Sequence, residues 1–273
     1  MESGNSKPKR ADAMDLIGPE FDRLSPEPAN RTLIICSAPR TGSYELCRFL
    51  IAAGIGVPHE YFHGNYSQLL GERWSFNDHP LTEAQLKRYV AALRRRRVQN
   101  GVFATKLQFG QFDRYLRNAH GAALFDGATV VHLFRPDVAT QYASARAALE
   151  SGTWDFSQRQ TSPPLQRDRA NSGEFIQQAL NELNWIVGED AGFRGLFVLL
   201  NIRPIFITTD ELFREPRNVV ARIAAAVAVP VNESALAEAI ALSAAYGHER
   251  AREKAVSGLG ETFRKIPFTN RVS

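Results

Sequence analysis

Residues 31–54, RTLIICSAPRTGSYELCRFLIAAG, constrain the fold of this chain more than any other segment. The run RTLIIC is short, rich in β-branched residues and apolar on both faces, which is typical of a fully buried parallel strand. Pro39 and Gly42 then mark a tight loop. Apolar residues recur with helical spacing after the loop until Gly54, a predicted helix C-cap. This order of strand, tight loop and helix predicts one unit of an α/β fold.

The same alternation continues along the chain. Short apolar runs predict three further buried strands, near 101–107, 129–135 and 204–209. Helical spacing predicts helices over 81–98, 137–152 and 173–200, and a short turn followed by a helix over 210–229. Two stretches are expected to be loops: the aromatic and histidine-rich 55–80 and the polar 152–172. Strands that alternate with helices imply one P-loop-like α/β domain, with a parallel sheet and helices on both faces.

Length and composition indicate the bounds of this domain and the compartment in which it lies. The chain has 273 residues, and we expect residues 1–30 to be a disordered tail and 31–273 to be one folded domain. The tail lacks the apolar core of a secretory signal, and no apolar run reaches the ~20 residues that span a bilayer. Cys36 and Cys47 lie in apolar surroundings without metal-ligand spacing. We therefore expect a cytoplasmic protein with no metal site and no stable membrane insertion.

The loop after the first strand is a candidate phosphate site. Ligands of open α/β sheets bind at the carboxyl ends of strands, and a helix N-terminus there favours anions. The backbone amides of Thr41, Gly42, Ser43 and Tyr44 would point at one spot, and Arg40 would add full positive charge. The loop lacks the GxxxxGK[ST] pattern of an NTPase. The alternative interpretation is a plain strand–helix turn, which the buried strand before the loop and the amphipathic helix after it disfavour.

A second candidate phosphate site follows the strand at 129–135. Arg135 ends this strand, and Ser144 lies about two turns along the next predicted helix, which Asp137 is expected to cap. An arginine at a strand end and a serine on the following helix can hold a phosphate beside the first loop. A surface arginine and an ordinary helix serine remain the alternative when this pair is considered alone.

Several segments taken together resemble a known family. SAPRTGS after a buried strand, HLFRPDVATQYAS and GVFATKLQFGQF resemble the corresponding segments of PAPS-dependent sulfotransferases. GVPHEYFH is similar to a segment of bacterial carbohydrate sulfotransferases of the trehalose 2-sulfotransferase group. The resemblance covers about residues 31–265. It implies the sulfotransferase fold, PAPS as donor with PAP as product, a carbohydrate or glycolipid acceptor, and a homodimer.

The resemblance also implies roles for single residues. The loop Arg40–Tyr44 would hold the 5′-phosphosulfate of PAPS, and Arg135 with Ser144 would hold its 3′-phosphate. Glu60 falls where the group places its catalytic base, and Arg40 would stabilise charge on the leaving phosphate. A sugar hydroxyl would attack sulfur in line without a metal ion, because positioning and charge stabilisation are the main demands of such a transfer.

Other assignments remain open in the sequence. His59 and His63 are rival bases, although each is more typical of a hydrogen-bonded loop histidine. Lys106 ends the second strand and is expected either to contact donor or acceptor or to form a structural ion pair. An ATP-dependent small-molecule kinase and a non-catalytic nucleotide-binding module are the alternative functions.

Two further features lie outside the phosphate sites. Consecutive arginines fan around a helix, so Arg94–Arg97 predict a solvated helix end and no nucleic-acid site. Trp154 and Trp185 are expected to serve in packing, with stacking on a sugar or adenine ring as the alternative, and acceptor contacts are expected in the loop around Trp154 to Arg169. The identity of the acceptor does not follow from the sequence.

Overall fold

The computed structural model of the chain describes residues 14–23, 25, 27–152, 154 and 173–245. Its helices and strands, in chain order, are η1 (Asp15–Ile17), η2 (Pro19–Phe21), β1 (Arg31–Ser37), α1 (Ser43–Ala53), α2 (Gly64–Arg73), α3 (Glu83–Arg96), β2 (Val98–Gln99), β3 (Val102–Leu107), α4 (Phe109–Gln111), η3 (Phe112–Leu116), α5 (Ala119–Ala122), β4 (Thr129–Phe134), α6 (Val138–Ser151), α7 (Gly173–Leu199), β5 (Ile205–Thr208), α8 (Thr209–Arg214), α9 (Pro216–Val227) and α10 (Glu233–Ala245). No described helix has both the length and the apolar character that a membrane span requires.

One five-stranded sheet forms the centre of the fold. Its strand order is β2-β3-β1-β4-β5. β1 runs parallel to β3 and to β4, and β5 runs parallel to β4, whereas the two-residue β2 is antiparallel to β3. The predicted α/β class and parallel sheet are confirmed. The sequence did not predict β2, because two residues are too few to show a periodicity.

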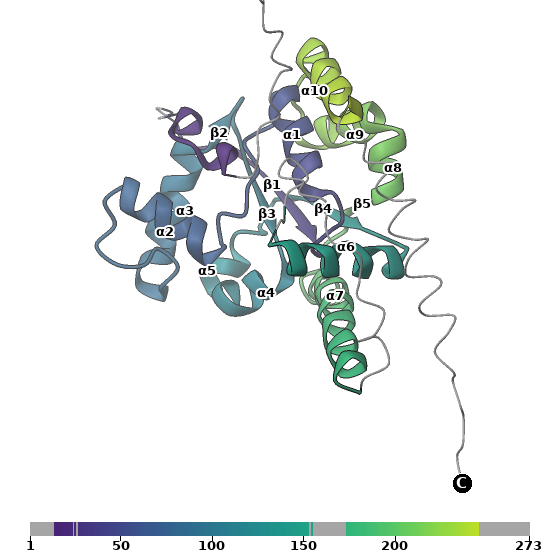
Figure 1. Cartoon of the computed structure of the whole chain (residues 1–273). Coiled ribbons are helices and arrows are strands. Elements are labelled where there is room, and N and C mark those ends of the chain that lie inside the picture. Colours follow the sequence, from purple (N-terminus) through teal and green to yellow (C-terminus); the bar gives the residue numbers. More distant parts are fainter. Residues whose placement is uncertain (1–13, 24, 26, 153, 155–172, 246–273) are drawn as a thin grey trace, which may run out of the picture.

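Helices cover both faces of the sheet, as predicted (Figure 1). Successive side chains of β1 point to opposite faces, so Leu33 and Ile35 pack with α1, α9 and α10. Ile34 and Cys36 pack on the other face with α2, α3 and α7. Both cysteines of the chain are buried free thiols, which agrees with the apolar surroundings that the sequence gives them.

The prediction that 55–80 is all loop is wrong, because α2 forms within it. Two glycines and several polar residues give this segment weak helical signals. The helix is stabilised by tertiary packing instead. Leu70 is fully buried in the core, and a Cβ on Gly71 would lie only 2.4 Å from the side chain of Pro80. Such close packing between segments does not appear in local sequence patterns.

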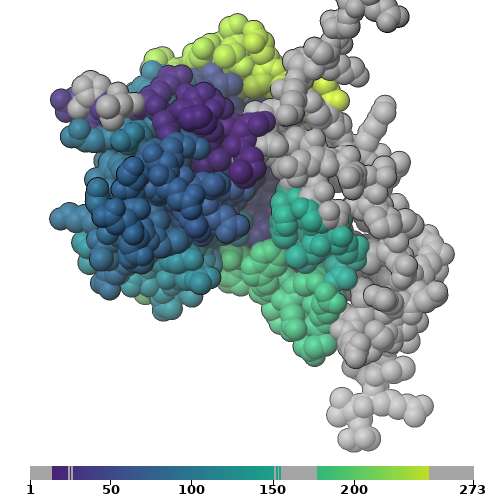
Figure 2. Space-filling model, turned by 60° about the vertical axis from the view of Figure 1, so that its left-hand side comes forward, coloured from purple at the N-terminus to yellow at the C-terminus, as the bar shows by residue number. Residues whose placement is uncertain are grey.

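The prediction of a tail over the first thirty residues does not hold for the described part of that segment. Leu16 and Ile17 are only 3% and 2% exposed and belong to the two cores. Figure 2 shows this amino-terminal segment, in purple, packed against the blue region that contains α2 and α3. Folded structure therefore begins before Arg31. Residues 1–13 lie outside the described part of the chain.

Arg97 explains why this segment is ordered. Its guanidinium is fully buried and donates to the carbonyl oxygens of Ile17 (2.8 Å) and Gly18 (3.1 Å). It also pairs with the carboxylate of Asp22 at 2.7 Å. The prediction of a solvated helix end is thus wrong for the last arginine of the run. A buried guanidinium with these partners fastens the amino-terminal segment to the domain.

Candidate active site

The loop between β1 and α1 has an unusual backbone. Gly42 has a φ of 84° and precedes the first residue of α1, and Arg40 has a φ of 66°. A Cβ on Gly42 would lie 3.0 Å from the ring of Phe213, so both the backbone angle and the space favour glycine. The left-handed conformation of Arg40 costs about 1–3 kcal/mol and persists only where neighbours enforce it.

Two distant residues enforce this loop conformation. Gln141 on α6 donates from Nε2 to the carbonyl oxygen of Pro39 at 2.7 Å. Thr209 at the start of α8 donates from Oγ1 to the carbonyl oxygen of Thr41 at 2.9 Å. The sequence analysis missed both. Both are buried polar residues, which becomes apparent only once the helices are placed.

The two candidate phosphate sites lie together. Arg40 donates from Nε to Ser144 Oγ at 2.9 Å, and Arg135 donates from a terminal nitrogen to the carbonyl oxygen of Arg40 at 3.4 Å. Arg40 also donates to the carbonyl oxygen of Trp154. The loop after β1 and the helix after β4 therefore form one cluster, although Arg40 and Ser144 are 104 residues apart.

The remaining predicted loop residues, Thr41, Ser43 and Tyr44, differ in where their side chains lie. Thr41 and Ser43 are buried, and the Thr41 hydroxyl donates to the carbonyl oxygen of Ala38 at 3.1 Å, which closes the loop. Ser43 begins α1, in whose first turn the backbone nitrogens of Glu45 (2.9 Å) and Leu46 (3.2 Å) donate to the carbonyl oxygen of the preceding Gly42. The side chain of Tyr44 extends instead toward Lys106, whose Nζ lies 4.4 Å from the centre of the tyrosine ring.

Asp137 caps α6 as predicted, next to the second candidate phosphate site. Its carboxylate accepts from the backbone nitrogen of Thr140 at 3.0 Å. Hydrogen bonds from Thr140 hold the pKa of Asp137 below its ordinary value, although partial burial opposes this, and the positive charge of Arg135 also lowers it. Asp137 is therefore an ionised cap at neutral pH, beside the arginine that ends the strand.

Glu60 lies at the centre of a second, buried group of polar side chains. Its Oε1 is ion-paired with Lys106, and its Oε2 accepts from the Nε2 atoms of Gln111 (2.7 Å) and Gln108 (3.4 Å). Burial by itself raises the pKa of Glu60. The charge and hydrogen bond of Lys106, with smaller contributions from His59 and Gln111, outweigh burial and hold that pKa below its ordinary value. Glu60 is therefore an ionised carboxylate with a nearby cation.

A further carboxylate, which the sequence analysis missed, supports this group. Glu189 on α7 is 5% exposed and accepts from the backbone nitrogens of Phe109 and Gly110, the latter at 3.0 Å. These amides begin α4, the short helix that carries Gln111 and follows Gln108. Burial raises the pKa of Glu189, although these amide hydrogen bonds oppose the shift. Glu189 thus fixes the turn that presents both glutamines to Glu60.

Aromatic rings join Glu60 and Lys106 to the start of α2. The ring of His59 lies 5.5 Å from that of Tyr44 and 4.6 Å from that of Tyr66. The ring of His63 lies 5.0 Å from that of Tyr66. His59 is fully buried between tyrosines, and His63 lies nearer the surface, so the two rival bases have different surroundings.

The tryptophans predicted to pack or to bind acceptor lie next to each other. Trp154 and Trp185 are 45% and 36% exposed, and their rings meet edge to face at 6.4 Å. Most of the predicted loop 152–172 lies outside the described residues, so its suggested acceptor contacts stay a prediction.

Comparison with known families agrees with this arrangement. Residues 32–251 match the family model described as Stf0 sulphotransferase. This match spans more than half of the chain. The matched range includes β1 except its first residue, the loop after β1, Glu60, Lys106 and the β4–α6 connection. A search of curated proteins finds no match to the chain. The chain belongs to the Stf0 sulphotransferase family and is a sulfotransferase.

Proposed function

We propose that this enzyme transfers the sulfuryl group of PAPS to a hydroxyl of a carbohydrate or glycolipid acceptor. The observation that carries the proposal is the 2.9 Å hydrogen bond from Arg40 Nε to Ser144 Oγ. It brings the loop after β1 and the helix after β4 into one cluster, with Arg135 bonded to the same loop. A nucleotide with phosphates at both its 5′ and 3′ positions would match two adjacent anion-binding elements.

The residues of this cluster fit such a donor. Gly42, in the left-handed conformation, places no side chain at the start of α1. Backbone amides and the helix dipole favour negative charge there. Arg40 and the loop Thr41–Tyr44 would hold the phosphosulfate. Arg135 and Ser144 would hold the 3′-phosphate. The positive charge needed for the leaving phosphate comes from Arg40 and the loop amides, so the proposal includes no metal ion.

Glu60 would act as the general base. It takes the proton of the acceptor hydroxyl as the oxygen–sulfur bond forms and the bond from sulfur to the leaving phosphate breaks. Lys106 and Gln111 keep the carboxylate ionised and oriented, which supports this role. His59 is less suited, because its ring packs between the rings of Tyr44 and Tyr66.

Replacement of Glu60 tests this assignment directly. Glu60→Gln should lower kcat by about 10²–10⁴, the usual contribution of a general base, and leave PAP affinity unchanged. Glu233→Gln, which alters an exposed ion pair on α10, is the control and should change neither quantity. Turnover of labelled PAPS near the parental level would remove Glu60 from the mechanism.

Thermal-shift measurements test the donor. PAP at about 100 times its Kd should stabilise the protein by about 2.7 kcal/mol without magnesium. Stabilisation by ATP with magnesium, and none by PAP, would instead support the kinase. PAP binding without sulfate transfer to any sugar would support the non-catalytic module.

We also propose a cytoplasmic homodimer. The two free, buried cysteines fit a reducing compartment. Val198 and Leu199, at the end of α7, are 82% and 83% exposed and would be covered in a dimer. Light scattering of the purified protein tests the assembly, and a monomer at micromolar concentration would contradict it.

A further inference from the structure

A pocket of about 430 Å³ lies beside α2, close to the group around Glu60. Its lining residues are Met14, His63, Asn65, Tyr66, Gln68, Leu69 and Glu72. Four of them recur at positions i, i+3, i+4 and i+7 of α2, so they share one face of this helix. The size is in the range of small-molecule sites in proteins.

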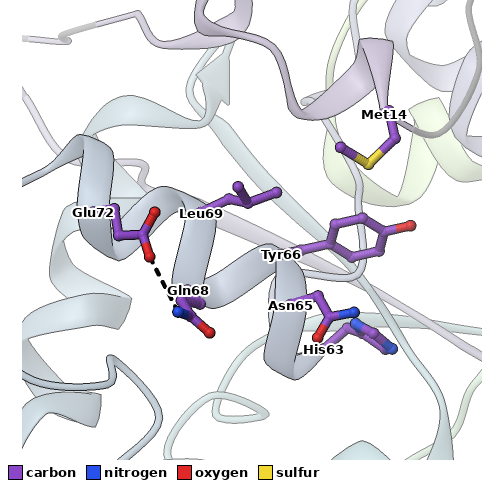
Figure 3. A pocket seen from close by; sticks show the side chains of 7 residues that line it. All are labelled: Met14, His63, Asn65, Tyr66, Gln68, Leu69 and Glu72. Carbon is purple, nitrogen blue, oxygen red and sulfur yellow. Dashed lines mark hydrogen bonds between the residues drawn. The ribbon is translucent and has the colours of Figure 1, made fainter.

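The pocket has a polar side and an apolar side (Figure 3). The side chains of Asn65, Gln68 and His63 offer amide and imidazole groups on one side, and Gln68 donates to Glu72 at 3.1 Å. Met14 and Leu69 lie on the other side and are 50% and 39% exposed.

Amides and a carboxylate near an aromatic ring suit the hydroxyl groups of a sugar, because each hydroxyl both donates and accepts. The ring of Tyr66 lies beside them. His63 also lines the pocket, and its buried Nδ1 atom has no hydrogen-bond partner within the described part of the chain.

The exposed apolar side suits a hydrocarbon chain. Two large apolar side chains next to each other lose contact with water when an alkyl or acyl group covers them. A free sugar would leave Met14 and Leu69 exposed. A sugar that carries an alkyl or acyl chain would use both sides of the pocket.

The pocket is connected to Glu60 by short contacts. The backbone nitrogen of His63 donates to the carbonyl oxygen of Glu60 at 3.0 Å, so one tight turn separates these residues. Tyr66 lines the pocket on one side and contacts the ring of His59 on the other. His59 in turn contacts Tyr44 of the candidate donor loop. An acceptor held in the pocket would therefore lie next to the candidate base and donor sites.

We infer that this pocket binds the non-reacting part of the acceptor, and that the acceptor is a sugar bearing an alkyl or acyl chain. The inference rests on the proposed function, because it assigns a substrate class to the same active site. The polar face of α2 orients the sugar. Met14 and Leu69 contact its alkyl or acyl chain.

Binding of octyl maltoside and of maltose to the PAP-loaded protein tests the inference. Saturation-transfer NMR below the micelle concentration measures both affinities without requiring turnover. Octyl maltoside should bind at least about tenfold more tightly than maltose, which corresponds to about two buried methylene groups. Leu69→Asn should remove most of this preference. Gln68→Ala should weaken both ligands about equally.

Matched controls come from other helices. Leu180→Asn replaces a similarly exposed leucine on α7, and Asn218→Ala removes an amide that donates to a glutamate at the same 3.1 Å distance on α9. Neither control should change either affinity. Equal affinities for octyl maltoside and maltose, or a preference that survives Leu69→Asn, would overturn the inference.

The same samples separate this inference from the proposed function. Calorimetric titration with PAP reports the donor site, which the α2 substitutions leave intact. Failure of PAP to bind the parental protein would contradict the proposed function. Octyl maltoside binding at α2 is then measured without PAP, so the pocket is judged on its own result.

Discussion

The two sides of β1 at its carboxyl end differ in how their charges are placed. Toward β4, the half-buried Arg40 and Arg135 donate to a hydroxyl and to backbone carbonyls, and Arg135 also interacts with the charge of Asp137. Toward β3, Glu60 and Lys106 form a buried pair of opposite charges. The first side is suited to an anion that arrives from outside, and the second holds one carboxylate in a fixed state within the protein.

Substitutions on the two sides should therefore affect different quantities, namely ligand affinity on one side and the free energy of unfolding on the other. Half-exposed arginines remain solvated, so their removal should weaken ligand binding more than folding. A buried ion pair behaves in the opposite way, because removal of one partner leaves the other charge buried and unpaired. The following changes test this contrast, in order of decreasing expected effect.

Lys106→Met should have the largest effect. It leaves the Glu60 carboxylate buried without its cation and should lower the free energy of unfolding by about 3–5 kcal/mol at neutral pH. Glu60→Gln/Lys106→Met should recover part of this loss, because no charge is then left buried. Urea denaturation of the parent, Lys106→Met and the double variant measures these changes. A double variant no more stable than Lys106→Met would contradict the contrast.

The pH dependence of the same proteins has a defined sign. The folded pKa of Glu60 lies below its unfolded value, so the pair stabilises fully above the ordinary carboxyl pKa. This stabilisation is lost as pH falls through the folded pKa. In Lys106→Met, burial without the cation should raise the pKa of Glu60 above its ordinary value. Mild acidification should therefore narrow the stability gap between variant and parent, and a gap that widens would be contrary to expectation.

Arg40→Ala should act on binding. The substitution removes a guanidinium placed to contact the donor and should weaken PAP by about 2–3 kcal/mol, with a much smaller loss of stability. Isothermal titration and urea denaturation measure the two quantities. Arg217→Ala, in an exposed pair on α9, is the control. A loss of stability larger than the loss of binding energy would reverse the comparison.

Gln111→Met should have a moderate effect on the base. It removes the 2.7 Å hydrogen bond to Glu60 and retains the volume of the side chain. The pKa of Glu60 should rise, because a hydrogen bond that stabilises the ionised carboxylate is lost, and the acidic limb of kcat should move to higher pH. Gln108→Met removes a longer contact of 3.4 Å and should shift the limb less. Equal shifts would mean that the two glutamines act only through the fold.

Ser144→Ala should have the smallest effect. It removes one hydroxyl next to Arg40 and should weaken PAP about fivefold, or about 1 kcal/mol. Ser67→Ala removes a hydroxyl that donates within α2 and should leave PAP affinity unchanged. An unchanged affinity in Ser144→Ala would place the 3′-phosphate elsewhere.

The sequence predicted one side of this comparison far better than the other. Residues of the side toward β4 lie in two short segments, each a strand followed directly by its helix, so local patterns identify them. The side toward β3 combines residues that are distant in sequence. Gln111 is 51 positions from Glu60, and Glu189 is 79 from Gly110. No periodicity links such residues, and only the packing of α4 against α7 brings them together.

The same reasoning explains where the fold prediction was wrong. The buried strands and their amphipathic helices were predicted because each carries its own hydrophobic pattern. The helix α2 and the described part of the amino-terminal segment depend on contacts with other segments, such as those of Gly71 and Arg97.

Because Arg97 holds the amino-terminal segment in place, this segment forms one wall of the α2 pocket. Met14 belongs to this wall, three residues before the carbonyl that Arg97 holds at Ile17. A shortened protein that started at β1 would keep the candidate donor and base residues and would forfeit one side of the α2 pocket. The guanidinium of Arg97 would also remain buried without its partners. Truncation would therefore change both the substrate preference and the stability of the enzyme.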